Sequence, residues 1–202
     1  MISTISGEGA SPEGGTLLTL CDPPDLVPIL VSQWNSYAFD YVARQKVGGT
    51  HLKYFTVRQL PVLPPSMSER PAPWSIRDTL STWLEQCVLA LVLDARDMAA
   101  LAQDFDRSLA VGAWDLDSRQ ALRTEVDAAM FHLYGIERVD VDYIRETFPI
   151  VKRKDVAAHG EYRTKRLILE IYDQMADAIR TGTPYSSPFD ATSPSIVDQP
   201  AK

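Results

Sequence analysis

The expected fold is decided by residues 34–65, WNSYAFDYVARQKVGGTHLKYFTVRQLPVLPP. The first part of this stretch carries an apolar or aromatic residue every three or four positions, which predicts an amphipathic helix. Asp25 is expected to cap this helix at its start, with Pro28 in the tolerated first turn. The Gly48-Gly49 pair is expected to end it by supplying left-handed residues. A helix that leads into a glycine turn is therefore predicted.

The residues after the glycine pair change character within a few positions. Residues 50–57 are rich in β-branched and aromatic side chains, so we expect a short strand or edge ribbon. Three prolines then hold the chain extended and exclude helix: Pro61, Pro64 and Pro65. Residues 66–73 are predicted to be a linker and form the clearest domain boundary in the chain.

The chain beyond the linker is predicted to be helical as far as Gly182. An apolar stripe at helical spacing begins after Trp74 and includes Trp83 and Leu84. Later helices are expected to begin near Asp97, Asp117, Asp140 and Thr164. Gly135 and Gly182 are expected to end helices as the first residue beyond the cap. The large aromatic side chains expected in the core or a partner interface are Trp74, Trp83, Phe105, Trp114, Phe131 and Phe148.

These patterns together predict a mainly α fold divided into segments. The expected segments are a disordered leader at 1–22, a first unit at 23–65, the linker at 66–73, a C-terminal helical domain at 74–182 and a disordered tail at 183–202. The leader and tail are rich in Gly, Ser, Thr and Pro and show no period, which is typical of disordered ends.

Composition restricts the class of protein. The 202 residues are 45% hydrophobic, which is enough to bury a core. No apolar run approaches the roughly 20 residues of a membrane span, and the first residues lack a signal-peptide pattern. Cys21 and Cys87 are single and distant, so neither a zinc site nor a disulfide scaffold is predicted. We expect a cytoplasmic protein with no membrane partner.

Charge is segregated along the chain, although the net charge is −7. Residues 41–68 contain four basic residues and no acid, and residues 152–166 contain six basic residues against two acids. Residues 77–146 instead carry fourteen acids against seven arginines. Such segregation favours a protein that presents one face to nucleic acid and another to solvent or a partner. Ordinary solvated faces are the alternative.

Two blocks of the chain, in the same order, resemble one protein family. The helix, Gly-Gly break and proline exit of residues 34–65 resemble the end of the target recognition domain in large type IIG-like adenine-specific DNA methyltransferases of restriction–modification and phage-defence systems. Residues 128–175, AAMFHLYGIERVDVDYIRETFPIVKRKDVAAHGEYRTKRLILEIYDQM, resemble the extreme C-terminus of the same enzymes. The resemblance implies a closing helix and short β segment of a recognition domain, followed by a helical domain.

The resemblance also implies the reaction of the parent enzyme, which is methyl transfer from S-adenosylmethionine to the exocyclic amine of a flipped adenine. The chain itself carries no catalytic motif. Asp22-Pro23-Pro24 is followed by Asp25, which cannot stack on a base as the aromatic residue of a catalytic Asp-Pro-Pro-aromatic loop does, so a capping turn is favoured. No glycine-rich loop follows a predicted strand, so no cofactor is expected in this chain. The three histidines are distant from one another and predict no metal site.

The glycine turn is the strongest candidate for contact with DNA. A glycine pair lets the backbone approach a phosphate closely, and flanking cations would add affinity through counterion release. The candidate residues in this segment are Arg44, Lys46, Gly48, Gly49, Thr50 and Lys53. Tyr54 and Phe55 could pack beneath the turn or lean on the sugar–phosphate chain. The alternative is a helix stop that only directs the next segment.

A second basic set brackets a predicted loop before the last helix. Its candidate residues are Lys152, Arg153, Lys154, Arg163 and Lys165, with Arg166 beside them. These cations could clamp phosphates and position DNA without reading its sequence. They could equally form ion pairs within the chain, since Glu161 and Glu170 lie at helical spacing from basic residues.

The sequence therefore leads to two functional hypotheses. The first is a non-catalytic C-terminal recognition and support module of an adenine-specific DNA methyltransferase, either a fragment or a split subunit. It would make non-specific phosphate contacts with double-stranded DNA beside a separately encoded catalytic subunit. The second is a helical protein-docking module for such a subunit, without DNA binding of its own. The acidic, tryptophan-rich middle of the chain favours the second hypothesis.

Overall fold

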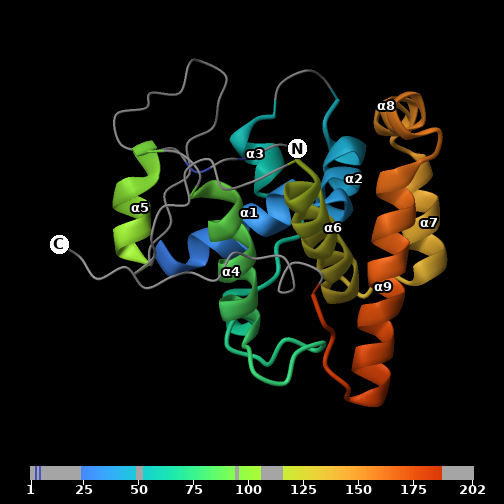
Figure 1. Cartoon of the computed structure of the whole chain (residues 1–202). Coiled ribbons are helices and arrows are strands. Elements are labelled where there is room, and N and C mark those ends of the chain that lie inside the picture. The colour runs from blue at the N-terminus through green and yellow to red at the C-terminus, as the bar shows by residue number, and fades with distance from the viewer. Residues whose placement is uncertain are drawn as a thin grey trace.

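The computed structural model describes residues 3, 5, 24–48, 52–93, 96–105 and 116–187. Within these residues the protein is mainly helical, and strand pairing is limited to an isolated bridge between Pro71 and Thr79. The α-helices are α1 (Val27–Asn35), α2 (Tyr37–Lys46), α3 (Tyr54–Val57), α4 (Leu80–Val92), α5 (Ala99–Asp104), α6 (Leu116–Leu133), α7 (Arg138–Glu146), α8 (Pro149–His159) and α9 (Arg163–Thr181) (Figure 1). Short 3-10 turns occupy Pro24–Leu26, Pro65–Met67 and Arg96–Met98.

Helix α6 is the centre of the packing. It lies against α9 along much of its length and also contacts α1, α2 and α4, while α7 and α8 pack on α9 (Figure 1). The middle of α6 is buried on all sides, from Ala128 to Phe131. The central core is formed by Leu122, Ala128, Met130 and Phe131 of α6, Leu80 and Leu84 of α4, Val141 of α7, Ile168 and Met175 of α9, and Trp74. The prediction of a mainly α fold is confirmed at this level.

The helix predicted from Asp25 to the glycine pair is two helices. Ser36 has extended backbone angles (φ −72°, ψ 150°) and separates α1 from α2. Its hydroxyl accepts a hydrogen bond from the Phe39 N–H at 3.2 Å, so Ser36 is the cap of α2. Pro28 lies in the first turn of α1, as expected, but Leu26 and not Asp25 is the capping residue. Ser36 marks the break between the two helices in the sequence, but the apolar spacing continues across it and therefore predicted one helix.

The strand predicted at residues 50–57 is wrong for the described part of that segment. Residues 54–57 form one turn of helix, closed by hydrogen bonds from the Val57 N–H to Lys53 O and from the Arg58 N–H to Tyr54 O. Thr56 and Leu60 are buried, and Leu60 packs with Phe39 and Ala43 of α2. A strand needs a neighbour for its backbone groups. The described residues offer none here, so the local helical turn satisfies them.

Both sides of the predicted linker share one hydrophobic core. Ile29 and Ala38 from the first unit pack in the same cluster as Leu80 and Leu122 from the second. The residues between them enter the core as well, since Ala72 is buried and α1 packs directly on α4. The described helices therefore form one packed body across residues 66–73.

Helix ends in the C-terminal half follow the sequence in part. Gly135 and Gly182 have positive φ of 64° and 73° and end α6 and α9, as predicted. Residues 149–159, expected to be partly loop, form helix α8, whose first residue is Pro149. Thr164 is not the cap of α9; its backbone N–H donates to the Asp155 carboxylate at 2.6 Å.

Two further expectations about the chain need correction. The helix expected after Trp74 begins at Leu80, where the Thr79 hydroxyl accepts from the Thr82 N–H. Residues 183–187, expected to be part of a disordered tail, pack onto the core, because the Tyr185 N–H donates to Trp74 O at 2.9 Å. Most of the predicted leader and the rest of the tail lie outside the described residues, as does Trp114. In the described part of the chain, no helix has the length and apolarity to cross a membrane.

Candidate nucleic-acid interface

A buried arginine joins the two family-like blocks of the sequence, residues 34–65 and residues 128–175. Arg145 on α7 has no solvent-exposed surface, and its guanidinium carbon lies 3.3 Å from the centroid of the Tyr37 ring on α2. Its Nη2 donates to the Tyr162 hydroxyl at 2.8 Å, and that hydroxyl donates to the Arg145 carbonyl oxygen at 2.9 Å. Cation–π contact of this kind is strongest where water is excluded.

A buried carboxylate completes this polar cluster. The Asp127 Oδ1 on α6 accepts the Tyr37 N–H at 2.8 Å. Burial raises the pKa of Asp127 to about 7, and the hydrogen bond from Tyr37 and the charge of Arg145 offset only part of that rise. Phe148 packs edge-on against Tyr37 with ring centroids 4.9 Å apart. Tyr37 of α2 thus contacts both Asp127 of α6 and Arg145 of α7 inside the core.

A second set of buried contacts fixes the proline-rich exit of the first block. Gln33 is buried in α1, and its Oε1 accepts the Leu63 N–H at 2.7 Å. The Tyr134 hydroxyl, just after α6, donates to Pro61 O at 3.0 Å. The extended segment at residues 61–63 is therefore held by one side chain of α1 and by one side chain of the second block.

The predicted phosphate-binding turn is only partly within the described residues. Gly49 and Thr50 lie outside them. Gly48 is exposed and its φ lies outside the left-handed region, so it does not stop α2 in the expected way. The cap is Val47, which is extended (φ −86°, ψ 106°). The physical reason is that an extended residue already ends the hydrogen-bond ladder before the glycine is reached.

The cations around this turn are exposed. Arg44 pairs with Asp40 one turn earlier on α2, at 2.8 Å, and its guanidinium lies 4.6 Å from the Phe148 ring centroid. Lys46 and Lys53 are solvent-exposed, and within the described residues neither forms an ion pair. The contact between Arg44 and Phe148 brings the C-terminal end of α2 beside the start of α8, at the same end of the molecule (Figure 1).

The second basic set is mostly neutralised by acids of the same chain. Lys152 Nζ lies 2.7 Å from Glu146 Oε2, and Lys165 Nζ lies 2.6 Å from Glu146 Oε1 and 2.9 Å from Asp142. Hydrogen bonds from Lys152 and Lys165 lower the pKa of Glu146 to about 2. Arg153 and Lys154 are exposed on α8, without an ion pair to another described residue.

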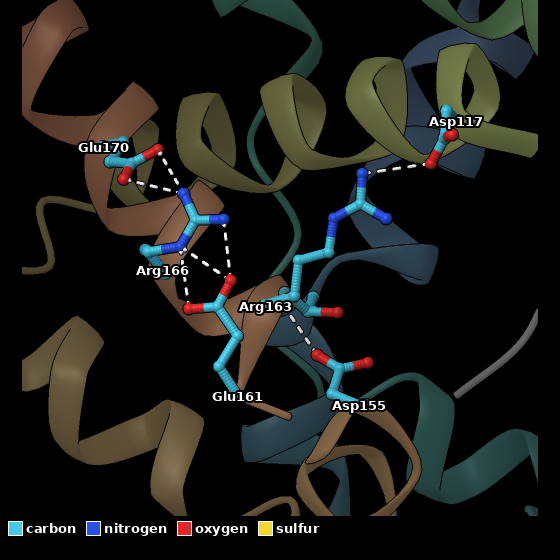
Figure 2. A network of polar contacts seen from close by, with 7 residues as sticks. Asp117, Asp155, Glu161, Arg163, Arg166 and Glu170 are labelled. Atoms are coloured by element: carbon cyan, nitrogen blue, oxygen red, sulfur yellow. Dashed lines mark hydrogen bonds and ion pairs between the residues drawn. The ribbon is translucent and has the colours of Figure 1, made fainter. Parts of the chain in front are cut away.

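The arginines of α9 are paired in the same way. Figure 2 shows Arg166 held between Glu161 and Glu170, with nitrogen–oxygen distances of 2.9 Å to each. It also shows Arg163 reaching back to Asp117 at the start of α6, at 3.0 Å. Arg163 and Arg166 therefore form ion pairs within the chain, which was the alternative to a phosphate clamp. An ion pair between exposed side chains contributes about 0–1 kcal/mol of stability.

The sequence placed two aromatic residues beneath the glycine turn or against the sugar–phosphate chain, without counting them among the DNA-binding residues. Tyr54 and Phe55 on α3 are 58% and 64% exposed, so more than half of each residue is open to solvent. They stand between Lys53 and Arg58, both exposed. The signal available in the sequence was the alternation of basic and aromatic residues in a stretch without acids.

The histidines and acids offer no metal centre in the described residues. His132 stacks on Tyr172 at 3.9 Å and hydrogen-bonds to Tyr172 O at 2.9 Å, and burial lowers its pKa. His132 therefore has a packing role. His51 lies outside the described residues, and His159 is exposed at the end of α8.

Comparison with known proteins found no matching family model, no matching curated protein and no matching solved structure. The functional argument therefore depends on the residues and geometry described above.

Proposed function

We propose that this chain is a non-catalytic C-terminal recognition and support module of an adenine-specific DNA methyltransferase of a restriction–modification or phage-defence system. As a fragment or split subunit, it acts beside a separately encoded catalytic subunit. Its own contribution is non-specific contact with the phosphates of double-stranded DNA and support for the end of the recognition domain.

The observation that carries this proposal is the buried joint between the two family-like blocks. Tyr37 belongs to the first block, and Arg145, Phe148 and Tyr162 belong to the second. The two blocks are separated by more than sixty residues in the sequence. The cation–π contact between Arg145 and Tyr37 and the paired hydrogen bonds between Arg145 and Tyr162 form only when the elements that carry them are packed together. Direct packing of the blocks supports the view that they act as one module.

The acid-free stretch supports the DNA-contacting part of the proposal. Lys46 and Lys53 are exposed and project from a segment without any acid between residues 41 and 68. Exposed cations that form no ion pair with another described residue gain most from phosphate contact, because binding releases counterions and breaks no such pair. Such contacts position a protein on DNA without reading its sequence.

The residues of this chain do not fit S-adenosylmethionine. Nucleotide-like cofactors bind at the carboxyl ends of parallel strands, where a glycine-rich loop leads into a helix. The described residues form no sheet, and none of their helices follows such a loop. No methyl-transfer step is assigned to this chain.

A protein-docking function is the second candidate, and one surface favours it. Val139 and Tyr143 lie one helical turn apart on α7 and are 69% and 62% exposed, and Ile150 on α8 is also exposed. Exposed apolar side chains at helical spacing are typical of a helix that docks on a partner.

A salt series distinguishes the two functions. Fluorescence anisotropy of a labelled random duplex should show binding whose affinity falls with salt, with a slope of several ions. The absence of binding at about 50 mM salt would favour the docking function. Calorimetry with S-adenosylmethionine should show no heat of binding, and micromolar affinity for the cofactor would contradict the assignment of a non-catalytic module.

A further inference from the structure

Helix α3 presents two adjacent aromatic rings to solvent on a firmly anchored turn. Phe55 is 64% exposed and Tyr54 is 58% exposed, whereas the next residue, Thr56, is buried. Leu60 packs on Phe39 and Ala43 of α2, which fixes the base of the turn. Leaving a phenylalanine ring in water forgoes about 1.5–3 kcal/mol of burial free energy. The two rings are therefore held outward by an anchored backbone.

The charges around these rings identify the chemistry of their partner. Arg58 lies four residues after Tyr54 and three after Phe55, which places all three on neighbouring positions of a helical turn. Lys53 precedes the rings, and both cations are exposed. With no acid from residue 41 to residue 68, the surface complements an anion. Aromatic faces flanked by cations suit a polymer that offers both flat rings and negative charge.

Two kinds of nucleic acid meet that description to different degrees. An intact duplex keeps its base faces stacked on one another, so it would leave Phe55 in contact with sugar and phosphate only. Single-stranded DNA exposes the faces of its bases, and stacking on an aromatic side chain stabilises such binding by about 1–3 kcal/mol per base. The exposed rings therefore favour unpaired DNA.

We propose that Tyr54 and Phe55 form a stacking surface for unpaired DNA bases, with Lys53 and Arg58 holding the flanking phosphates. The inference rests on the proposed function only in taking DNA as the partner. It adds a preference for a distorted or single-stranded segment, such as the one left when a target base leaves the helix. Because stacking does not depend on base identity, this surface recognises the unpaired state and not a sequence.

The test compares one variant on two probes, using the full chain. The probes are a labelled oligothymidylate of about 12 nucleotides and a labelled hairpin duplex. The variant Tyr54→Ala/Phe55→Ala should bind the single strand about 10- to 100-fold more weakly, from the loss of one or two stacked bases. Its duplex affinity should change less than about twofold, with an unchanged salt slope, because no cation is removed. The variant Tyr54→Trp/Phe55→Trp should retain single-strand affinity.

The matched control is Val139→Ala/Tyr143→Ala, which removes two side chains of similar exposure from α7. It should leave both affinities unchanged. Because both pairs are exposed, urea unfolding should show a stability change within about 0.5 kcal/mol for either variant.

Several results would overturn the stacking surface. Full single-strand affinity in the α3 variant would do so while leaving duplex binding, and with it the proposed function, intact. Equal weakening on both probes would show general contact in place of stacking. An equal loss of single-strand affinity in the α7 control would show that the effect is not specific to the α3 rings. No binding of the wild-type chain to either probe at low salt would overturn this inference and the proposed function together.

Discussion

Lysine and arginine cluster in residues 41–68 and again in residues 152–166, and the two clusters have opposite surroundings. In the second cluster Lys152 and Lys165 share Glu146, and Arg163 reaches Asp117, which is 46 residues away in the sequence. In the first, Lys46 and Lys53 are exposed in a stretch without acids. A charge count over one stretch is thus a poor guide to which cations remain outside ion pairs, because acids beyond that stretch, such as Glu146 and Asp117, pair with them.

Arg145 shows a third environment for a cation in the same chain. It is buried, and aromatic rings and the Tyr162 hydroxyl surround it. Its charge contributes to folding and is inaccessible to DNA. The comparison between the basic clusters can be tested by removing cations or acids from each environment in turn.

The largest effect is expected from Arg145→Ala. Removing the guanidinium withdraws the cation that lies over the Tyr37 ring and donates to the Tyr162 hydroxyl inside the core. Truncating a large buried side chain leaves a cavity, and the change also removes a water-excluded cation–π contact of about 2 kcal/mol, so urea unfolding at neutral pH should report a loss of about 3–5 kcal/mol. The exposed Arg153→Ala on α8 is the control and should change stability by less than about 0.5 kcal/mol. Equal effects would contradict a structural role for Arg145.

A pH-dependent effect is expected from Asp127→Asn. The folded pKa of Asp127 is raised from 3.8 to about 7 by burial. The stability that this carboxyl contributes is therefore fully present below about pH 4 and is lost as the pH rises to about 7. The variant has no such loss, and an amide oxygen can still accept the Tyr37 N–H. The unfolding free energy of the variant minus that of wild type should increase by up to about 4 kcal/mol between pH 4 and pH 8. A pH-independent difference between the two proteins would contradict the raised pKa.

The sequence predicted the helices better than it predicted the site. Apolar periodicity located the buried faces of α4, α6 and α9, because a helix that packs on one side carries an apolar residue every three or four positions on that side. It could not locate the break at Ser36, because apolar spacing carries no information about a cap within it. It also could not predict the helical turn of α3, because whether a strand-like segment forms a strand depends on a neighbouring strand in the folded protein. The ion pair between Arg163 and Asp117 could not be predicted from the sequence either, because it depends on how α6 and α9 pack.

DNA affinity should respond differently to the two clusters. Replacing Arg44, Lys46 and Lys53 by Ala should weaken binding to random duplexes uniformly and lower the salt slope by about two, from Lys46 and Lys53, because Arg44 is already paired with Asp40. The matched variant replaces Lys152, Arg163 and Lys165 by Ala, removing the same charge. Its slope should fall by less than about one in total, because these cations are held by Glu146, Asp142 and Asp117. Anisotropy across a salt series measures both, and equal slopes would contradict the comparison.

The smallest effect, and the sharpest test of why the clusters differ, is expected from Glu146→Gln. Glu146 holds Lys152 and Lys165 together, and their hydrogen bonds lower its pKa to about 2. Neutralising it frees Lys152 for phosphate contact and leaves Lys165 paired with Asp142 alone, so duplex affinity should rise a few-fold and the salt slope should steepen by about one. Loss of these exposed pairs should cost less than about 1 kcal/mol of stability.

The matched control for this change is Asp177→Asn. Asp177 pairs only with the exposed Arg180 among the described ion pairs, so the substitution alters the net charge equally while leaving Glu146 in place. If sequestered lysines limit DNA binding, the control should raise affinity much less than Glu146→Gln does. Equal gains from the two variants would show that net charge alone sets the affinity, because long-range attraction to DNA does not depend on which acid is removed. Pairing with Glu146 would then have no part in the difference between the two clusters.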